Sequence, residues 1–195
     1  MLMSQQQALE AIVPYRDSRI VVSTMSAAKL WPQISDTPMD FTFLPSTMGQ
    51  APGLGLGLAL AQPERGVIVI NGDGSMLMNL GALVTIAAHP APLYLIVMDN
   101  GMYEVTGGQP TAGSRNVRFE DIAKAAGIPR TYTFEDFDSW ERGAEESLQG
   151  EGPVFICLKV EARYGQSSPK PIHPMRDQII RLQKTLNVEP LFSQG

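Results

Sequence analysis

The chain has 195 residues, of which 44% are hydrophobic and 18% charged, which favours one medium globular domain and excludes a disordered or collagen-like protein. Its 15 Lys and Arg residues against 20 Asp and Glu residues give a net charge of −5, and the absence of a basic run excludes a nucleic-acid-binding surface built on clustered cations. No apolar run reaches the ~20 residues of a membrane span, and the N-terminus lacks a signal pattern, so we expect a cytoplasmic protein without a membrane partner.

Strands and helices are predicted to alternate along the chain. The expected strands are 19–23, 41–44, 67–70, 93–98, 131–133 and 154–160. The expected helices are 49–61, 75–88, 120–126, 134–148 and 175–186. Continuous apolar strands separated by helices predict an α/β three-layer sandwich, a mostly parallel sheet with helices on both faces. We expect one domain over residues 1–162, followed by a C-terminal arm and helix over residues 163–195.

Glycines recur every four residues in the first of these helices. Gly49, Gly53 and Gly57 would form a bare ridge along one helix face. Since each glycine costs a helix roughly 1 kcal/mol relative to alanine, we expect this ridge to approach a sheet, another helix or a ligand closely. The glycines lie inside the helix rather than at a strand-to-helix turn, which argues against a dinucleotide-binding fingerprint.

Charge is scarce between residues 41 and 98, where the charged residues are Glu64, Arg65 and Asp73. Glu64 and Arg65 share a predicted surface turn, so Asp73 is the isolated charge of a region that helices, or a second subunit, are expected to cover. A buried carboxylate is unfavourable unless it is paired or bound to a cation. The lone Cys157, within the predicted strand 154–160, is expected to be a buried, inert thiol.

A glycine-rich turn follows the strand 67–70 and contains Gly72, Asp73, Gly74 and Ser75. Ligands of open α/β sheets bind at the carboxyl ends of the strands. Free backbone N–H groups there attract phosphate, Ser75 could cap the next helix and donate to a phosphate oxygen, and Asp73 could hold the neutralising cation. The alternative is a tight turn whose Asp caps a helix.

The next strand, 93–98, ends at Asp99 and Asn100. If the two strands are parallel neighbours, Asp73 and Asn100 lie at the same edge of the sheet, and their separation of 27 positions suffices for one helix and one returning strand. Carboxylate and amide oxygens are the ligands that Mg²⁺ prefers. This favours a magnesium diphosphate site over a simple turn.

The spacing of Gly72-Asp73-Gly74 and Asn100 resembles the diphosphate-binding domain of thiamine diphosphate-dependent enzymes, and Ser46-Thr47-Met48-Gly49 is similar to the Gly-Ser-Met-Gly segment of that family. The resemblance implies the cofactors thiamine diphosphate and Mg²⁺. It implies that the metal ligands are the side chains of Asp73 and Asn100 and the carbonyl of Met102. The cofactor contacts that it implies are Thr24, Met48, Gly49, Gly72, Gly74, Ser75, Asn100 and Tyr103. The family often has Gly where Met25 stands.

Two further segments, 76–83 and the Gly107-Gly108-Gln109-Pro110-Thr111 sequence, resemble sulfopyruvate and phosphonopyruvate decarboxylases. This resemblance implies a β-type subunit of a decarboxylase that acts on a small 2-oxo acid. The alternatives are an acetolactate synthase-like protein, another thiamine diphosphate-dependent transferase or oxidoreductase subunit, and a non-catalytic cofactor-binding protein. One cysteine argues against iron–sulfur clusters in this chain.

The resemblance also implies a partner. In this family a glutamate on an aminopyrimidine-binding domain activates the cofactor, and 195 residues cannot hold both domains, so we expect a hetero-oligomer together with self-association. Glu10 and Glu104 do not match the place of that glutamate. His89 is expected to end a helix, and His173 lies in a proline-rich segment. A sulfonate or phosphonate substrate would favour an arginine in its binding site. Three arginines could serve, but we expect them to be solvated surface charges: Arg115, Arg118 and Arg163.

Overall fold

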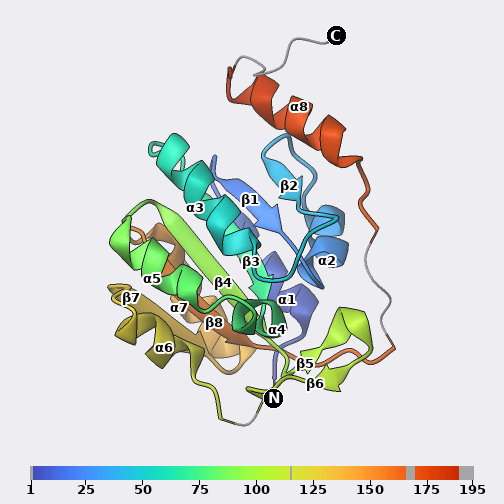
Figure 1. The fold of residues 1–195 in the computed structure, drawn as a ribbon, viewed down its shortest axis with the longest axis vertical. Helices are drawn as coiled ribbons and strands as arrows, with labels where there is room; N and C mark the ends of the chain where they lie inside the picture. The colour runs from blue at the N-terminus through green and yellow to red at the C-terminus, as the bar shows by residue number, and fades with distance from the viewer. Residues whose placement is uncertain (1, 115, 166–169, 189–195) are drawn as a thin grey trace.

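A six-stranded sheet forms the centre of the molecule in the computed structural model, which describes residues 2–114, 116–165 and 170–188 (Figure 1). The strand order is β2-β1-β3-β4-β8-β7, and every neighbouring pair is parallel. The strands are β1 (Ile20–Ser23), β2 (Asp40–Thr42), β3 (Val67–Gly72), β4 (Leu93–Asp99), β7 (Arg130–Phe134) and β8 (Val154–Lys159). This confirms the predicted parallel α/β sheet.

Helices cover both faces of this sheet, because its strands are apolar on both sides. One buried cluster joins the sheet to α3 (Ala51–Ala61), α5 (Gly81–Ala88) and α6 (Phe119–Ala125). The other joins it to α1 (Gln5–Glu10), α2 (Ala27–Ile34) and α7 (Phe137–Gln149). Cys157 is buried in the first cluster, and burial raises its pKa to about 12, as expected of an inert thiol.

The C-terminal helix α8 (Met175–Thr185) lies against the edge strand β2 (Figure 1). Leu182 is buried in the core. Gln178 accepts a hydrogen bond from the Thr42 backbone N–H at 2.7 Å and donates one to its carbonyl at 3.2 Å, so it satisfies groups that an edge strand leaves open. No helix in the described part of the chain is long and apolar enough to span a membrane.

Short elements complete the carboxyl edge of the sheet. The hairpin strands β5 (Met102–Tyr103) and β6 (Gln109–Pro110) are antiparallel, and the 3₁₀ turn η2 (Glu104–Thr106) connects them. A further 3₁₀ turn, η1 (Val13–Tyr15), follows α1. In Figure 1 this hairpin lies near α1 and α4, close to the marked N-terminus.

The predicted helix 75–88 is wrong as a single element. The structure has α4 (Asp73–Leu77) and α5, separated by a turn. The Asn79 side chain donates a hydrogen bond to the Gly49 carbonyl at 3.0 Å, which holds this turn against the start of α3. Ser75 consequently lies inside α4, whose N-cap is Gly72, and not at the capping position predicted for it.

The predicted glycine ridge is also wrong. Gly53 and Gly57 are exposed, and a Cβ atom at either would meet nothing within 4 Å. The glycine that allows close approach is Gly55, where a Cβ would lie 2.1 Å from the Val69 Cγ2 atom of β3. Gly49 precedes the helix at a φ of +89°, and a Cβ there would lie 2.9 Å from the Asn79 Cβ. The prediction was therefore wrong in placing Gly49 inside the helix, and no described residue closely approaches the ridge at Gly53 and Gly57.

Candidate functional site

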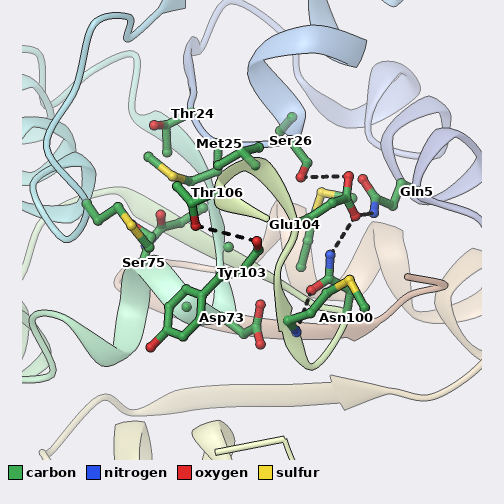
Figure 2. A pocket seen from close by; sticks show the side chains of 18 residues that line it. Gln5, Thr24, Met25, Ser26, Asp73, Ser75, Asn100, Tyr103, Glu104 and Thr106 are labelled. Carbon is green, nitrogen blue, oxygen red and sulfur yellow. Dashed lines mark hydrogen bonds between the residues drawn. The ribbon is translucent and has the colours of Figure 1, made fainter. Parts of the chain in front are cut away.

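The two polar motifs of the sequence meet at the carboxyl edge of the sheet. Strands β3 and β4 are parallel neighbours with Gly72 opposite Met98, so Asp73 and Asn100 follow adjacent strand ends, as predicted. A pocket opens between them, and the β1–α2 turn, α1, α4 and the 100–106 segment line it (Figure 2). The site residues expected from the sequence line this pocket, except Gly49: Thr24, Met48, Gly72, Asp73, Gly74, Ser75, Asn100, Met102 and Tyr103.

Asp73 is 2% exposed, although it is the isolated charge of its region. Burial, followed by the nearby negative charge of Asp99, raises its pKa to about 6. The Thr111 hydroxyl donates a hydrogen bond to its Oδ2 atom at 3.1 Å. A cation beside Asp73 would remove the electrostatic penalty of two neighbouring carboxylates.

Asn100 is held through both ends of its amide. Its Nδ2 atom donates a hydrogen bond to Glu104 Oε2 at 2.7 Å, and its Oδ1 atom accepts one from the Met102 N–H at 3.0 Å (Figure 2). An amide oxygen has two lone pairs, so one remains for a cation.

Gly74 allows the backbone to lie against an aromatic ring. A Cβ at this position would approach the Tyr103 ring to 2.6 Å and the Thr111 methyl to 3.3 Å. Ser75 Oγ accepts a hydrogen bond from the Gly49 N–H at 2.9 Å, which leaves its own proton free to donate. Gly49 therefore contributes to the site through Ser75 without lining the pocket.

The β1–α2 turn brings Thr24 and Met25 to the opposite wall. Thr24 is buried, and its hydroxyl lies 3.0 Å from the Ser46 hydroxyl. Met25 has a φ of +53°, a conformation that glycine adopts with less strain, which matches the glycine expected at this position from the family pattern. Met48 is half-buried at the pocket wall.

The buried side-chain amide of Asn71 indicates whether the pocket suits a polar ligand. It is 1% exposed and lines the pocket, and neither its Nδ2 nor its Oδ1 atom has a hydrogen-bond partner among the described residues. Buried polar groups are normally satisfied, so this side chain indicates a bound polar group or an ordered water. With the oxygens of Asp73 and Asn100, this donor set fits a diphosphate and a hard cation.

Sequence reasoning missed a group of side chains around Glu104. This residue is 5% exposed and accepts hydrogen bonds from Gln5, Ser26 and Asn100. Gln5 lies 99 positions away in the chain, and no local pattern could have connected the two. The signal available for Glu104 was its position four residues after Asn100.

The remaining candidates lie outside this pocket or outside the described residues. Arg118 is exposed and forms an ion pair with Asp121 at 2.6 Å. His89 is the C-cap residue of α5, as predicted, and His173 lies 3.2 Å from Asp36. The Arg163 N–H donates a hydrogen bond to Glu104 at 3.2 Å, and Arg115 lies outside the described residues.

Residues 20–158 match the family described as thiamine pyrophosphate enzyme, C-terminal TPP binding domain, where TPP is thiamine diphosphate. The chain belongs to this family. The match includes β1, β3 and β4, the strands whose ends form the pocket.

The chain is similar to proteins of two lengths. It is 37% identical over 164 residues to the sulfopyruvate decarboxylase subunit beta of Methanothermobacter thermautotrophicus, covering 83% of this chain and 84% of that one. The subunit of Methanocaldococcus jannaschii is 39% identical, with 73% of this chain and 76% of that one covered. The phosphonopyruvate decarboxylase of Streptomyces viridochromogenes is 35% identical over 74% of this chain, which spans 36% of that longer protein.

Solved structures support the fold. A putative thiamin diphosphate-dependent enzyme from Mycobacterium smegmatis superposes with a TM-score of 0.69 at 24% identity, covering 83% of this chain and 32% of that one. The benzoylformate decarboxylase of Polynucleobacter necessarius gives a TM-score of 0.69 at 19% identity, covering 88% and 35%. The three-layer α/β architecture is therefore that of thiamine diphosphate-dependent enzymes.

Proposed function

We propose that this chain is the thiamine diphosphate- and Mg²⁺-binding subunit of a 2-oxo acid decarboxylase that resembles the sulfopyruvate and phosphonopyruvate enzymes. The observation that carries the proposal is the meeting of Asp73 and Asn100 at adjacent strand ends, beside the unpartnered amide of Asn71. The two sulfopyruvate decarboxylase beta subunits match this chain over 84% and 76% of their own length, and their names support a subunit.

The pocket residues divide into metal and phosphate contacts. Asp73, Asn100 and the carbonyl of Met102 would hold Mg²⁺, whose remaining ligands are phosphate oxygens and water. The backbone at Gly72 and Gly74 and the Ser75 hydroxyl would donate to the diphosphate, with Thr24, Gly49 and Tyr103 shaping the walls.

Thiamine diphosphate supplies an electron sink for the pair of electrons that remains on the substrate when CO₂ leaves. Met48 lines the same pocket from the segment before α3. A bulky apolar side chain there would support the bent shape of the cofactor and hold its reacting groups in place.

A partner chain would supply the aminopyrimidine-binding domain and its activating glutamate. Glu104 is fully hydrogen-bonded at the metal end of the pocket, and Glu10 is exposed on α1. The apolar side chains that α3 and the α4–α5 region expose would support self-association of this chain in the cytoplasm: Leu60, Met78 and Val84, each more than half exposed.

Calorimetry of the purified chain tests the cofactor assignment. Thiamine diphosphate should bind in the presence of Mg²⁺ and only weakly with EDTA, and Asp73→Ala should remove the dependence on Mg²⁺ while the far-UV circular dichroism spectrum stays unchanged. Asp121→Ala, which removes an exposed carboxylate, is the matched control and should bind like the wild type. Mg²⁺-dependent affinity that survives in Asp73→Ala would contradict the assignment.

Product analysis with the partner chain separates the alternative activities. A decarboxylase releases an aldehyde and CO₂, an acetolactate synthase-like protein forms a condensed acetohydroxy acid, and a non-catalytic binding protein forms neither.

A further inference from the structure

Glu104 is a buried carboxylate at the metal end of the pocket. Its Oε2 atom accepts hydrogen bonds from Gln5 Nε2 at 2.6 Å, Asn100 Nδ2 at 2.7 Å and the Arg163 N–H at 3.2 Å, and its Oε1 atom accepts one from the Ser26 hydroxyl at 3.0 Å. These donors come from α1, the 100–106 segment, the segment after β8 and the start of α2, and Figure 2 shows three of them, Gln5, Asn100 and Ser26, around Glu104. A buried carboxylate requires such donors, and hydrogen bonds to an ionised acceptor are stronger than neutral ones.

The hydrogen bonds of Asn100 determine the orientation of its amide, with Nδ2 toward Glu104 and Oδ1 toward the Met102 N–H. A carboxylate only accepts, so Glu104 must face the Nδ2 end, and a backbone N–H only donates, so Met102 must face the Oδ1 end. Both neighbours therefore select the same orientation. Without Glu104, the contact with Met102 alone would hold the amide oxygen.

We propose that Glu104 is a positioning residue that holds the Asn100 amide with its oxygen available to the cation. The inference rests on the proposed function, because it assigns Oδ1 of Asn100 as a metal ligand. An amide turned by 180° would present Nδ2, which cannot bind a hard cation. Groups behind a metal ligand commonly fix its orientation in this way.

Glu104 acts through Asn100 rather than as a ligand itself. Both of its carboxylate oxygens are occupied by donors from other segments, and the Arg163 N–H lies on the same oxygen as Asn100. The same cluster provides a matched control, because Ser26 binds the Oε1 atom and does not contact Asn100.

Glu104→Gln tests this role with a side chain of the same shape. The new amide can donate to Asn100 as well as accept from it, so the preference for one orientation then rests on the Met102 N–H alone. In calorimetry on the purified full chain, the affinity for Mg²⁺ with thiamine diphosphate should fall about 10- to 100-fold, with the thermal midpoint of the metal-free chain changed no more than in Ser26→Ala. Ser26→Ala removes one donor to Glu104 and so measures the effect of weakening the same cluster, and its loss of affinity should be smaller than that of Glu104→Gln.

Nuclear magnetic resonance of the metal-free wild-type chain gives a readout that does not depend on binding or on a variant that folds. The Asn100 side-chain amide protons, assigned from through-bond correlations in the isotope-labelled wild-type chain, should be protected from exchange and shifted downfield by the carboxylate. Exchange as fast as that of an exposed asparagine would overturn the inference.

The outcomes separate the two proposals. Parallel losses of affinity and thermal midpoint in Glu104→Gln and Ser26→Ala would leave the proposed function standing but overturn the positioning role, since Glu104 would then only connect α1 and α2. Absence of Mg²⁺-dependent binding in the wild type would overturn the proposed function and this inference together.

Discussion

At the scale of single residues, the pocket contains a buried carboxylate, which is unfavourable for folding unless it is paired or bound to a cation. Asp73 is buried near Asp99, and its pKa is raised by burial and by that neighbour. Lys159 lies against the other side of Asp99 and balances one of the two carboxylates. The sequence predicted that Asp73 is a buried charge, because it is the isolated charge of an apolar stretch. It did not reveal Asn71, whose side chain has no hydrogen-bond partner among the described residues.

Met48 allows a test that separates the shape of the cofactor from its attachment. It lines the pocket with an apolar side chain that cannot bind phosphate, so Met48→Ala should lower turnover of the assembled enzyme far more than the affinity for thiamine diphosphate. Steady-state kinetics and calorimetry on the same preparation measure the two quantities. Equal losses in both would identify Met48 as ordinary packing.

At the scale of elements, the sheet was predictable and its local attachments were not. Continuous apolar runs identified the strands, because a parallel strand is buried on both faces. Helix α2 was missed, since Pro32 lies inside it and its apolar positions give no long pattern. The separation of α4 from α5 depends on the bond from Asn79 to Gly49, a contact between segments 30 residues apart.

The same substitution, glycine to alanine, should have opposite effects on stability at two positions of α3. Gly53→Ala should raise the free energy of unfolding by about 1 kcal/mol, because the position is exposed and alanine favours the helix. Gly55→Ala should lower it by about 1–3 kcal/mol, because the new Cβ would overlap the Val69 side chain. Urea unfolding measures both. A loss of stability in Gly53→Ala equal to that in Gly55→Ala would contradict the assigned helix face.

Asp40, at the start of β2, gives a prediction for acid stability. Burial raises its pKa, but hydrogen bonds from the Thr37 N–H, the Trp31 indole and the Ser35 hydroxyl, with the charge of Arg16, hold the pKa below its usual value of 3.8. A depressed carboxyl pKa contributes stability that is present above pH 3.8 and lost as the pH falls through the folded-state value.

Asp40→Asn should therefore flatten the fall in stability below pH 3.8. At neutral pH it should lower the free energy of unfolding by about 3–5 kcal/mol, because Arg16 is left buried without its partner. Asp121→Asn, in an exposed pair, should change stability by about 0–1 kcal/mol. An unchanged acid profile in Asp40→Asn would contradict the assignment.

At the scale of the whole molecule, the proposed function makes this chain one of two that together form the active site. The pocket is lined by Asp73 and Asn100, and the carboxylate of Glu104, which also lines it, accepts hydrogen bonds from Gln5, Ser26 and Asn100. The family pattern could predict that Asp73 and Asn100 lie together, because both follow the ends of adjacent parallel strands. Nothing in the sequence identified the substrate, and no cation with a clear role in binding it faces the pocket among the residues that line it.

The most direct test is reconstitution of decarboxylation. CO₂ release from sulfopyruvate and from phosphonopyruvate is measured with the purified chain alone, with a partner chain that carries the aminopyrimidine-binding domain alone, and with both, each with and without Mg²⁺ and thiamine diphosphate. We predict release from the mixture with both cofactors present and none from either chain alone. Robust thiamine diphosphate-dependent CO₂ release from this chain by itself would contradict it.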